Sequence, residues 1–375
     1  MRYKLGEICE IVSGSTPKTG VPEYWDGNIK WITPAELNED SYIIKDSARK
    51  ITELGVRKTG LSSFPAGTVI LSSRAPIGKV AIAGCEMYCN QGFKNLICSE
   101  KINNRYLFWF LKGRTEYLNS LGRGATFKEI SKKIVASIEI NVPSIKEQED
   151  AVQILERTSK LIKLRKREVE ELDNLIKARF VEMFGDPVYN PSAGKVELSE
   201  ICVKITDGEH GSVERVPYGH PFLNAKHILK NGQIDWDTIT FICDEDHHRI
   251  FKRCNPEEGD ILLTTTGTIG NVAIMPKFEE VSMDRGITLL KIDRRKVTSE
   301  FVAELLKQPS IQNEMGVNVH ASAIGHLFMN KVKKLPAILP TMERQVEFTS
   351  FVKQVDKSKC DTSNKTSATQ YQLAS

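Results

Sequence analysis

The chain has 375 residues, with 52 lysines and arginines against 48 aspartates and glutamates, so its formal net charge is only +4. Hydrophobic residues make up 40% of the chain and charged residues 27%, which excludes a wholly disordered protein, and no apolar run approaches the ~20 residues that cross a bilayer. We therefore expect two globular domains in a soluble, cytoplasmic chain with no membrane contact, and the modest charge does not by itself demand a nucleic-acid partner.

The sequence contains an internal repeat, which predicts two copies of one fold. Three segments recur in the same order: 5–9 (LGEIC) as 198–202 (LSEIC), 67–71 (GTVIL) as 259–263 (GDILL), and 77–82 (IGKVAI) as 269–274 (IGNVAI). We expect the first copy over residues 1–143 and the second over residues 196–340.

Each copy is predicted to be an α+β domain with many loops. In the first copy, residues 68–71 and 80–83 are predicted to form strands rich in β-branched side chains on either side of a glycine-containing turn. Residues 105–112 have the pattern of an amphipathic helix. The second copy repeats this plan, with strands at 260–263 and 272–275 and a helix at 300–307.

A long helix is predicted between the copies, over residues 144–184. This stretch contains neither glycine nor proline, and apolar side chains recur every seven residues, which indicates a coiled-coil seam. About 40 residues at ~1.5 Å each would make a rod of about 60 Å. The seam residues, with those expected on a matching C-terminal helix, are Leu155, Ile162, Val169, Leu172, Ile176, Met183, Phe351 and Val355.

The chain after the long helix is predicted to hold a linker at 185–195, the second copy, and a shortened helix at 341–359 that pairs with the first in antiparallel fashion. Residues 360–375 are rich in serine and threonine and show no seam, so we expect a polar tail without helix. Loss of the distal half of this helix would expose Val169, Ile176 and Met183 on the long helix.

Catalytic and metal-binding motifs are missing from the sequence. There is no phosphate-binding loop, no HExxH or GxSxG motif and no CxxC pair. Cys243, His247, His248 and Cys254 lie close together, but acidic residues crowd the same stretch, and we expect a solvated polar loop there with no metal. We therefore assign no catalytic residue, metal or cofactor to this chain.

Polar and basic residues in the loops are candidates for DNA contacts, since arginine and lysine bind phosphates or guanine, and glutamine and threonine contact other base edges. The turns at 72–79 and 264–271 recur between the copies while their residues differ, as two readers of different sequences would require. The candidates in the first copy are Lys18, Lys30, Arg74, Lys79, Gln91, Lys94, Arg123 and Lys128. Those in the second copy are His210, Lys226, His227, Thr266, Arg285, His320 and Ser322.

The sequence resembles the specificity (S) subunit of type I restriction–modification systems over nearly its full length. The matching segments are 14–17 (GSTP) with 24–32 (YWDGNIKWI), 207–211 (DGEHG) with 221–226 (PFLNAK), the turn at 266–270, and Pro143 with Glu147 and Gln148. Their order, their duplication and the long helix between them make the match specific.

The resemblance implies two target-recognition domains separated by long antiparallel coiled-coil helices, each domain reading one half of a split, asymmetric site in double-stranded DNA. The helices would set the gap between the halves and dock modification (M) subunits, of which we expect two. Those subunits would carry the S-adenosylmethionine chemistry, and restriction (R) subunits would carry ATP- and Mg²⁺-dependent cleavage. The chain itself would be a non-catalytic DNA-recognition subunit.

Two other readings remain open from the residues alone. The chain could be a coiled-coil adaptor whose two domains bind proteins, or a self-contained enzyme such as a nuclease, although the missing catalytic motifs weigh against the latter.

Overall fold

The computed structural model describes residues 1–124, 128–191, 194–278, 280–319 and 325–374. The chain divides into two compact units, one of residues Met1–Leu164 with Ser367–Ser375, and one of residues Arg165–Thr366. Within the described residues, no helix is both long and apolar enough to pass through a membrane.

The first unit contains a five-stranded sheet and a three-stranded sheet. The order of the larger sheet is β2 (Cys9–Ser13), β9 (Phe93–Cys98), β6 (Val69–Ser72), β7 (Val80–Ala83) and β4 (Ile43–Ile44), and that of the smaller is β5 (Arg49–Ile51), β3 (Trp25–Ile32) and β8 (Tyr88–Cys89). The helices are α1 (Leu5–Ile8), α2 (Glu53–Thr59), α3 (Asn104–Lys112), α4 (Thr115–Ser120) and α5 (Lys132–Ser137). Strands β1 (Arg2–Lys4) and β10 (Glu139–Asn141) pair with each other, so the chain enters and leaves this copy at one place.

The second unit repeats most of this topology, with four strands in its larger sheet. Its four-stranded sheet has the order β14 (Cys202–Asp207), β20 (Ile287–Ile292), β17 (Ile261–Thr264) and β18 (Val272–Ile274), and its three-stranded sheet has the order β16 (Thr240–Ile242), β15 (His220–Leu223) and β19 (Ser282–Met283). Two further pairs are β13 (Lys195–Glu197) with β21 (Pro336–Ile338), and β11 (Gly185–Asp186) with β12 (Asn190–Pro191). Its short helices are α7 (Asp244–Arg253), α8 (Ser299–Leu306), α9 (Pro309–Val317) and α10 (Met329–Lys333). The predicted α+β fold with an internal repeat is therefore confirmed.

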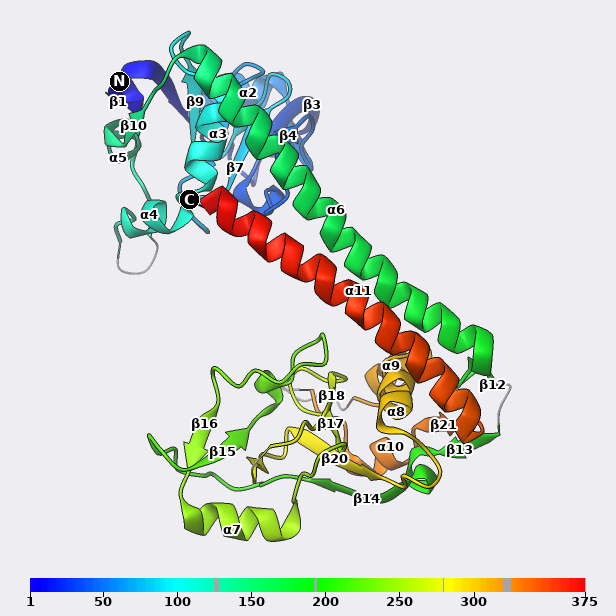
Figure 1. Ribbon diagram of the computed structural model, residues 1–375. Helices are drawn as coiled ribbons and strands as arrows, with labels where there is room; N and C mark the ends of the chain where they lie inside the picture. The colour runs from blue at the N-terminus through cyan, green and yellow to red at the C-terminus, as the bar shows by residue number, and fades with distance from the viewer. Residues whose placement is uncertain (125–127, 192–193, 279, 320–324, 375) are drawn as a thin grey trace. The chain divides into compact units, whose positions relative to one another are not determined.

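Two long helices, α6 (Ile145–Phe184) and α11 (Met342–Ala374), lie side by side within the second unit (Figure 1). Their seam ends in four fully buried phenylalanines, Phe180, Phe184, Phe301 and Phe348, whose ring centroids lie 5.1–5.6 Å apart. Burial of each such ring contributes roughly 1.5–3 kcal/mol, so this cluster holds the paired helices against α8.

The predicted seam residues are buried to different degrees. Ile176, Met183 and Val355 belong to the buried core of the second unit, and Leu172 and Phe351 pack against it. Val169 is half-buried, as are Leu155 and Ile162 in the part of α6 that belongs to the first unit.

The expectation of a shortened distal helix and a non-helical tail is wrong. Helix α11 continues to Ala374, and Ile176 and Met183 are 3% and 6% exposed, so they are not uncovered. Hydroxyl groups bond back to carbonyls one turn earlier, as Thr366 Oγ1 does to Thr362 O at 2.8 Å. A contact with α6 supports this segment of weak intrinsic helix propensity, since Arg165 Nη1 donates to Lys365 O at 2.5 Å.

The prediction of a polar loop around Cys243–Cys254 is also wrong, because residues Asp244–Arg253 form helix α7. Three acidic residues occupy its first turn, and Lys252 and Arg253 its last. This order of charges stabilises the helix macrodipole, so the acidity that suggested a solvated loop belongs to a helix start.

A buried glutamine anchors the start of each long helix in the same way. The Gln148 Oε1 atom accepts from the backbone N–H of Asn103 at 2.8 Å, and its Nε2 donates to two carbonyls. Gln345 repeats the pattern, accepting from Thr298 N at 2.9 Å and donating to Lys296 O and Pro340 O, both at 2.9 Å. Both glutamines are fully buried, so each long helix is fixed to its own copy of the repeated domain.

Candidate nucleic-acid interface

One tight turn, which we call the tip turn, displays a single polar side chain in each copy. It comprises residues 90–92 in the first copy and 284–286 in the second. The Asn90 Oδ1 atom accepts from Gly92 N at 2.9 Å, and the Asp284 Oδ1 atom accepts from Gly286 N at 2.9 Å. Such side-chain-to-backbone bonds are the Asx turns that asparagine and aspartate favour. The residue between them, Gln91 or Arg285, is exposed.

A second turn lies against each tip turn. Ser73 N donates to Gly92 O at 2.7 Å, and Thr265 N donates to Gly286 O at 2.8 Å. The next residues differ in chemistry: Arg74 forms a β-bridge with Glu129, whereas Thr266 forms the matching bridge with His326. The backbone is therefore repeated, and the side chains at its surface are not.

A glycine lets a neighbouring strand approach the base of each tip turn. A Cβ atom on Gly14 would lie 2.2 Å from Cys89 O, and one on Gly208 would lie 2.0 Å from Met283 O. No side chain fits at either position, which explains why both copies have glycine there.

In the second copy the tip turn borders two adjoining hollows, of about 510 Å³ and 390 Å³. Both are lined by Arg215, Asp284 and Arg285, and we call them together the second-copy groove. The remaining lining residues are Asn224, Ala225, Lys226, Thr240, Thr266 and Gly286 in the larger hollow, and Glu209, His210, Gly211, Ser212, Val213 and Phe222 in the smaller.

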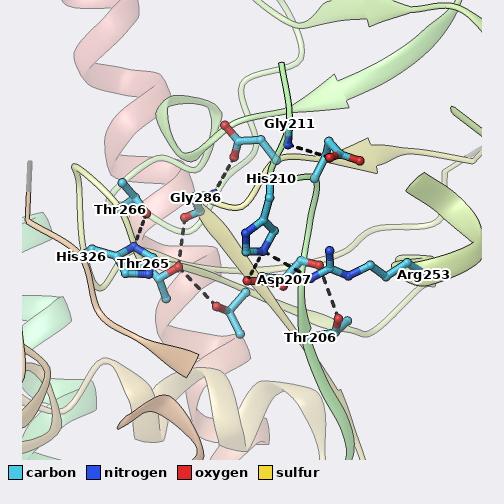
Figure 2. A network of polar contacts seen from close by, with 12 residues as sticks. Thr206, Asp207, His210, Gly211, Arg253, Thr265, Thr266, Gly286 and His326 are labelled. Carbon is cyan, nitrogen blue, oxygen red and sulfur yellow. Dashed lines mark hydrogen bonds and ion pairs between the residues drawn. The ribbon is translucent and has the colours of Figure 1, made fainter. Parts of the chain in front are cut away.

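Ion pairs fix the loop of Glu209 and His210 at one side of this groove. Asp207 lies between His210 and Arg253 (Figure 2), with its Oδ2 2.8 Å from His210 Nε2. Glu209 accepts from Gly211 N at 2.7 Å and pairs with Arg249. The Gly211 N–H, and then the Arg249 guanidinium, lower the pKa of Glu209, so this carboxylate is ionised at pH 7.

His326 contacts Thr266, which lines the larger hollow, with Oγ1 and Nδ1 2.7 Å apart (Figure 2). Burial, and then the positive charge of Arg285, lower the pKa of His326. Its imidazole is therefore neutral at pH 7, and Arg285 lines both hollows together with Arg215.

The second-copy candidates fall into three groups. His210, Lys226, Thr266 and Arg285 line the groove, as their prediction as binding residues requires. His227 does not, because it is fully buried: its Nδ1 accepts from Asn224 N at 3.0 Å and its Nε2 lies 3.2 Å from Thr238 O. His320 and Ser322 lie outside the described residues.

The ammonium groups of three first-copy candidates bond to other groups of the protein. Lys30 Nζ donates to Lys45 O at 2.7 Å, and Lys79 Nζ donates to the carbonyls of Pro34 and Leu37. Lys94 is buried and lies 3.2 Å from both Ser73 Oγ and Glu129 Oε1. These ammonium groups stabilise the fold, so their choice as DNA contacts is not supported.

The other first-copy candidates remain at the surface. Lys18, Gln91, Arg123 and Lys128 are exposed, and Arg74 is half-buried, with its Nη1 3.9 Å from Glu129. The backbone of Arg123 pairs with that of Glu129. Arg74 and Lys94 therefore meet at the Glu129 carboxylate, and Arg123 pairs with the backbone of the same residue.

Sequence reasoning missed several groove residues, among them Arg215, Asn224 and Asp284, and it also missed His326, which contacts Thr266. Asp284 could have been found from the pattern Asp-Arg-Gly at 284–286, which matches Asn-Gln-Gly at 90–92, since an Asx residue two before glycine is typical of a turn. Arg215 follows no such pattern, and it is placed by stacking on Phe222, with 4.2 Å between the guanidinium carbon and the ring centroid.

Burial of His227 predicts a loss of stability in mild acid. Burial, and then the charge of Lys226, lower the pKa of His227, whereas the unfolded chain takes up a proton near pH ~6.5. The stabilisation is therefore present above that pH and is lost as the pH falls through the folded-state pKa. We expect His227→Gln to flatten the fall in melting temperature between pH 7 and pH 5. His248→Gln, a control at an exposed position on α7, should follow the parent chain, and equal slopes in all three proteins would contradict this origin.

Comparison with known proteins finds one family domain twice in the chain, in agreement with the internal repeat. The family model described as the type I restriction modification DNA specificity domain matches residues 1–174 and again 195–369. The chain is 35% identical over 248 residues to the type I restriction enzyme MjaIX specificity subunit of Methanocaldococcus jannaschii, which covers 60% of this chain and 57% of that protein. The MjaVIII specificity subunit of the same organism is 22% identical over 378 residues, covering 94% and 85%.

The fold also matches a solved chain from a study of complex assembly and conformational transition of the type I R-M system. The TM-score is 0.63 at 17% identity, with 100% of this chain and 95% of that chain covered. The aligned region spans only 57% of the length of the MjaIX relative. Because the family model covers both repeats, the resemblance seen in the sequence is confirmed: the chain belongs to the type I restriction modification DNA specificity domain family and carries two copies of that domain.

Proposed function

We propose that this chain is a DNA-recognition subunit in which each copy reads one half of a split, asymmetric site in double-stranded DNA. The observation that carries the proposal is the tip turn, which has the same hydrogen bonds in both copies but displays Gln91 in one and Arg285 in the other. Identical readers would bind a repeated sequence, whereas these two would bind different ones.

The two displayed side chains suit base edges in the major groove of DNA. An arginine guanidinium donates two hydrogen bonds to guanine O6 and N7, and a glutamine amide can both donate to and accept from adenine. The neutral His326 beside Thr266, and the acidic Asp284 and Glu209, would restrict which neighbouring groups fit next to Arg285.

The chemistry is proposed to belong to partner subunits, and a subunit of this kind would work in the cytoplasm. The relatives are named as specificity subunits of type I restriction enzymes, so we propose two methyltransferase (M) subunits that supply S-adenosylmethionine chemistry, and restriction (R) subunits that use ATP and Mg²⁺. A net charge of +4 fits this division, because phosphate contacts that strengthen binding can come from the partners.

Methylation mapping tests this proposal. The chain is expressed with a cognate M subunit in a host without its own adenine methylation, and methylated adenines are located by long-read sequencing. We expect one split motif that appears only when both proteins are present, and native mass spectrometry should show two M subunits per chain. A stable complex without any new motif would favour a protein-binding adaptor, and DNA cleavage by the purified chain alone would indicate a nuclease; either result would overturn the proposal.

A further inference from the structure

An arginine lies over an aromatic ring of the three-stranded sheet in each copy. In the first copy, the guanidinium carbon of Arg49 is 3.6 Å from the ring centroid of Trp25 and 5.8 Å from that of Trp31. In the second copy, the guanidinium carbon of Arg215 is 4.2 Å from the ring centroid of Phe222. We call Arg49 and Arg215 the stacked arginines. A guanidinium over a ring is attracted by it and keeps the N–H groups at its edge available as donors.

Trp31 and Phe222 occupy the same position of the repeat. Trp31 lies in β3 and Phe222 in β15, which are the middle strands of their three-stranded sheets. In each copy the carbonyl of the next residue accepts from the backbone N–H of the first tip-turn residue: Ile32 from Asn90 at 3.1 Å, and Leu223 from Asp284 at 3.0 Å. Each of these two rings is therefore one residue away from the point where its strand holds the tip turn.

The two stacked arginines come from different segments of the chain. Arg49, on β5, is the cross-strand partner of Trp31. The cross-strand partner of Phe222 is Thr240, so the second copy has no arginine at that strand position. Arg215 reaches the ring from the loop before β15 instead. Residues that are not equivalent in the repeat therefore place the same chemical group at the same point of both copies.

Neither stacked arginine forms an ion pair with a carboxylate that the structure describes. Both side chains are exposed, and Arg215 Nη1 donates to a carbonyl of its own loop, Val213 O, at 2.9 Å. By contrast, Arg249 and Arg253 of the second copy are paired with carboxylates. The charge of the stacked arginines is therefore not compensated within the protein, and an anion from outside can bind to it.

The stacked arginine of the second copy faces the same hollows as the tip turn. Both hollows of the second-copy groove are lined by Arg215 and Arg285, and the larger one also by Thr240. Thr240 occupies the strand position that Arg49 has in the first copy. The repeat therefore places Arg49 beside the tip turn of its own copy.

We propose that Arg49 and Arg215 each contact a DNA phosphate next to the base that the neighbouring tip turn reads, an inference that rests on the proposed function. The tip-turn side chains differ between the copies, as contacts to different bases require. The stacked guanidinium is the same in both copies although different segments supply it, which indicates a ligand that both half-sites share. The phosphate backbone is such a ligand, because it carries no sequence information and arginine can bind a phosphate through two N–H groups at once.

DNA binding by the complex of the full chain with its cognate M subunits tests the proposal. Fluorescence anisotropy measures the affinity for a duplex with the mapped split motif and for an unrelated duplex, from about 50 to about 200 mM salt. Loss of one phosphate contact should reduce the slope of log affinity against log salt by about 0.9. We expect this change for Arg49→Ala and for Arg215→Ala, with about tenfold weaker binding to both duplexes and an unaltered methylation motif.

Conservative and distant variants separate a phosphate contact from a structural role. Arg49→Lys and Arg215→Lys keep the charge and should restore the parental salt slope. The controls Arg2→Ala and Arg294→Ala remove exposed arginines that bond to Glu139 and to Glu258 O, and should also keep that slope. Circular dichroism checks the fold of each variant.

The outcomes distinguish this inference from the proposed function. Parental affinity and salt slope in both alanine variants would overturn the phosphate contacts, and so would relaxation of one half of the motif, because the arginine would then read a base. Because Arg215 lies in a surface loop, its variants test the proposal even where Arg49→Ala does not fold. Absence of any split motif with the parent complex would instead overturn the proposed function itself.

Discussion

Replacement of Arg285 by alanine is expected to relax recognition in one half of the DNA site and to leave the other half unchanged. Arg285 is exposed at the tip turn of the second copy; its backbone N–H donates to Glu209 O, and the next residue, Gly286, donates to Asp284. The substitution therefore removes the guanidinium without moving the turn. Loss of a bidentate contact to guanine costs about 1–3 kcal/mol of discrimination.

Methylation mapping with the cognate M subunit measures this effect base by base. The matched control is Arg294→Ala, which removes an exposed arginine of the same unit that bonds to Glu258 O outside the groove. Gln91→Ala should give the reciprocal result, relaxing only the half read by the first copy. Equal weakening at all sequences by Arg285→Ala would show that this arginine contacts phosphate instead of a base.

Replacement of Gln345 by leucine is expected to destabilise the second copy strongly. Gln345 is fully buried, joins the start of α11 to the segment before α8 through two hydrogen bonds, and donates a third to Pro340 O. Leucine has a similar size but leaves the N–H of Thr298 and two carbonyls without this partner. Unsatisfied buried groups of this kind cost roughly 1–3 kcal/mol each, so the loss should be on the order of 3 kcal/mol or more.

Urea denaturation measures this loss of stability, and hydrogen exchange shows in which copy it occurs. Gln345→Leu should lower the unfolding midpoint and speed exchange in the second copy, and Gln148→Leu should do the same in the first copy, where the hydrogen bonds are equivalent. Gln354→Leu, at an exposed position on α11, serves as the control. If Gln345→Leu and Gln354→Leu unfold at the same urea concentration, the anchor does not contribute to stability.

The repeat and the regular elements could be predicted from the sequence because their signals are local. The strand predicted at 80–83 is β7, and the helix predicted at 105–112 is α3 with one more residue at its start. Alternation and apolar spacing determine such elements within a few residues. The match of Gln148 with Gln345 was also visible in the sequence, although its three hydrogen bonds were not.

The candidate site was harder to predict because long polar side chains choose partners that are distant in the chain. Lys79 has the character of a DNA contact in the sequence, yet its amine reaches carbonyls more than 40 residues earlier. His227 resembles a surface histidine until β15 and its neighbours bury it. The prediction for the C-terminal segment was wrong for a similar reason, since its helix is supported by a contact with α6, from Arg165 to Lys365 O, that its own composition does not reveal.

The pairing of β1 with β10, and of β13 with β21, brings the two ends of each copy of the domain together beside a long helix. In the first copy, Met1 and Val142 exchange both backbone hydrogen bonds beside this pair. A recombination event that joins DNA at these two strands would therefore exchange a whole domain and leave the buried glutamine and the long helix untouched. In such a design a cell could acquire a new DNA target in one genetic step, without evolving a new partner surface.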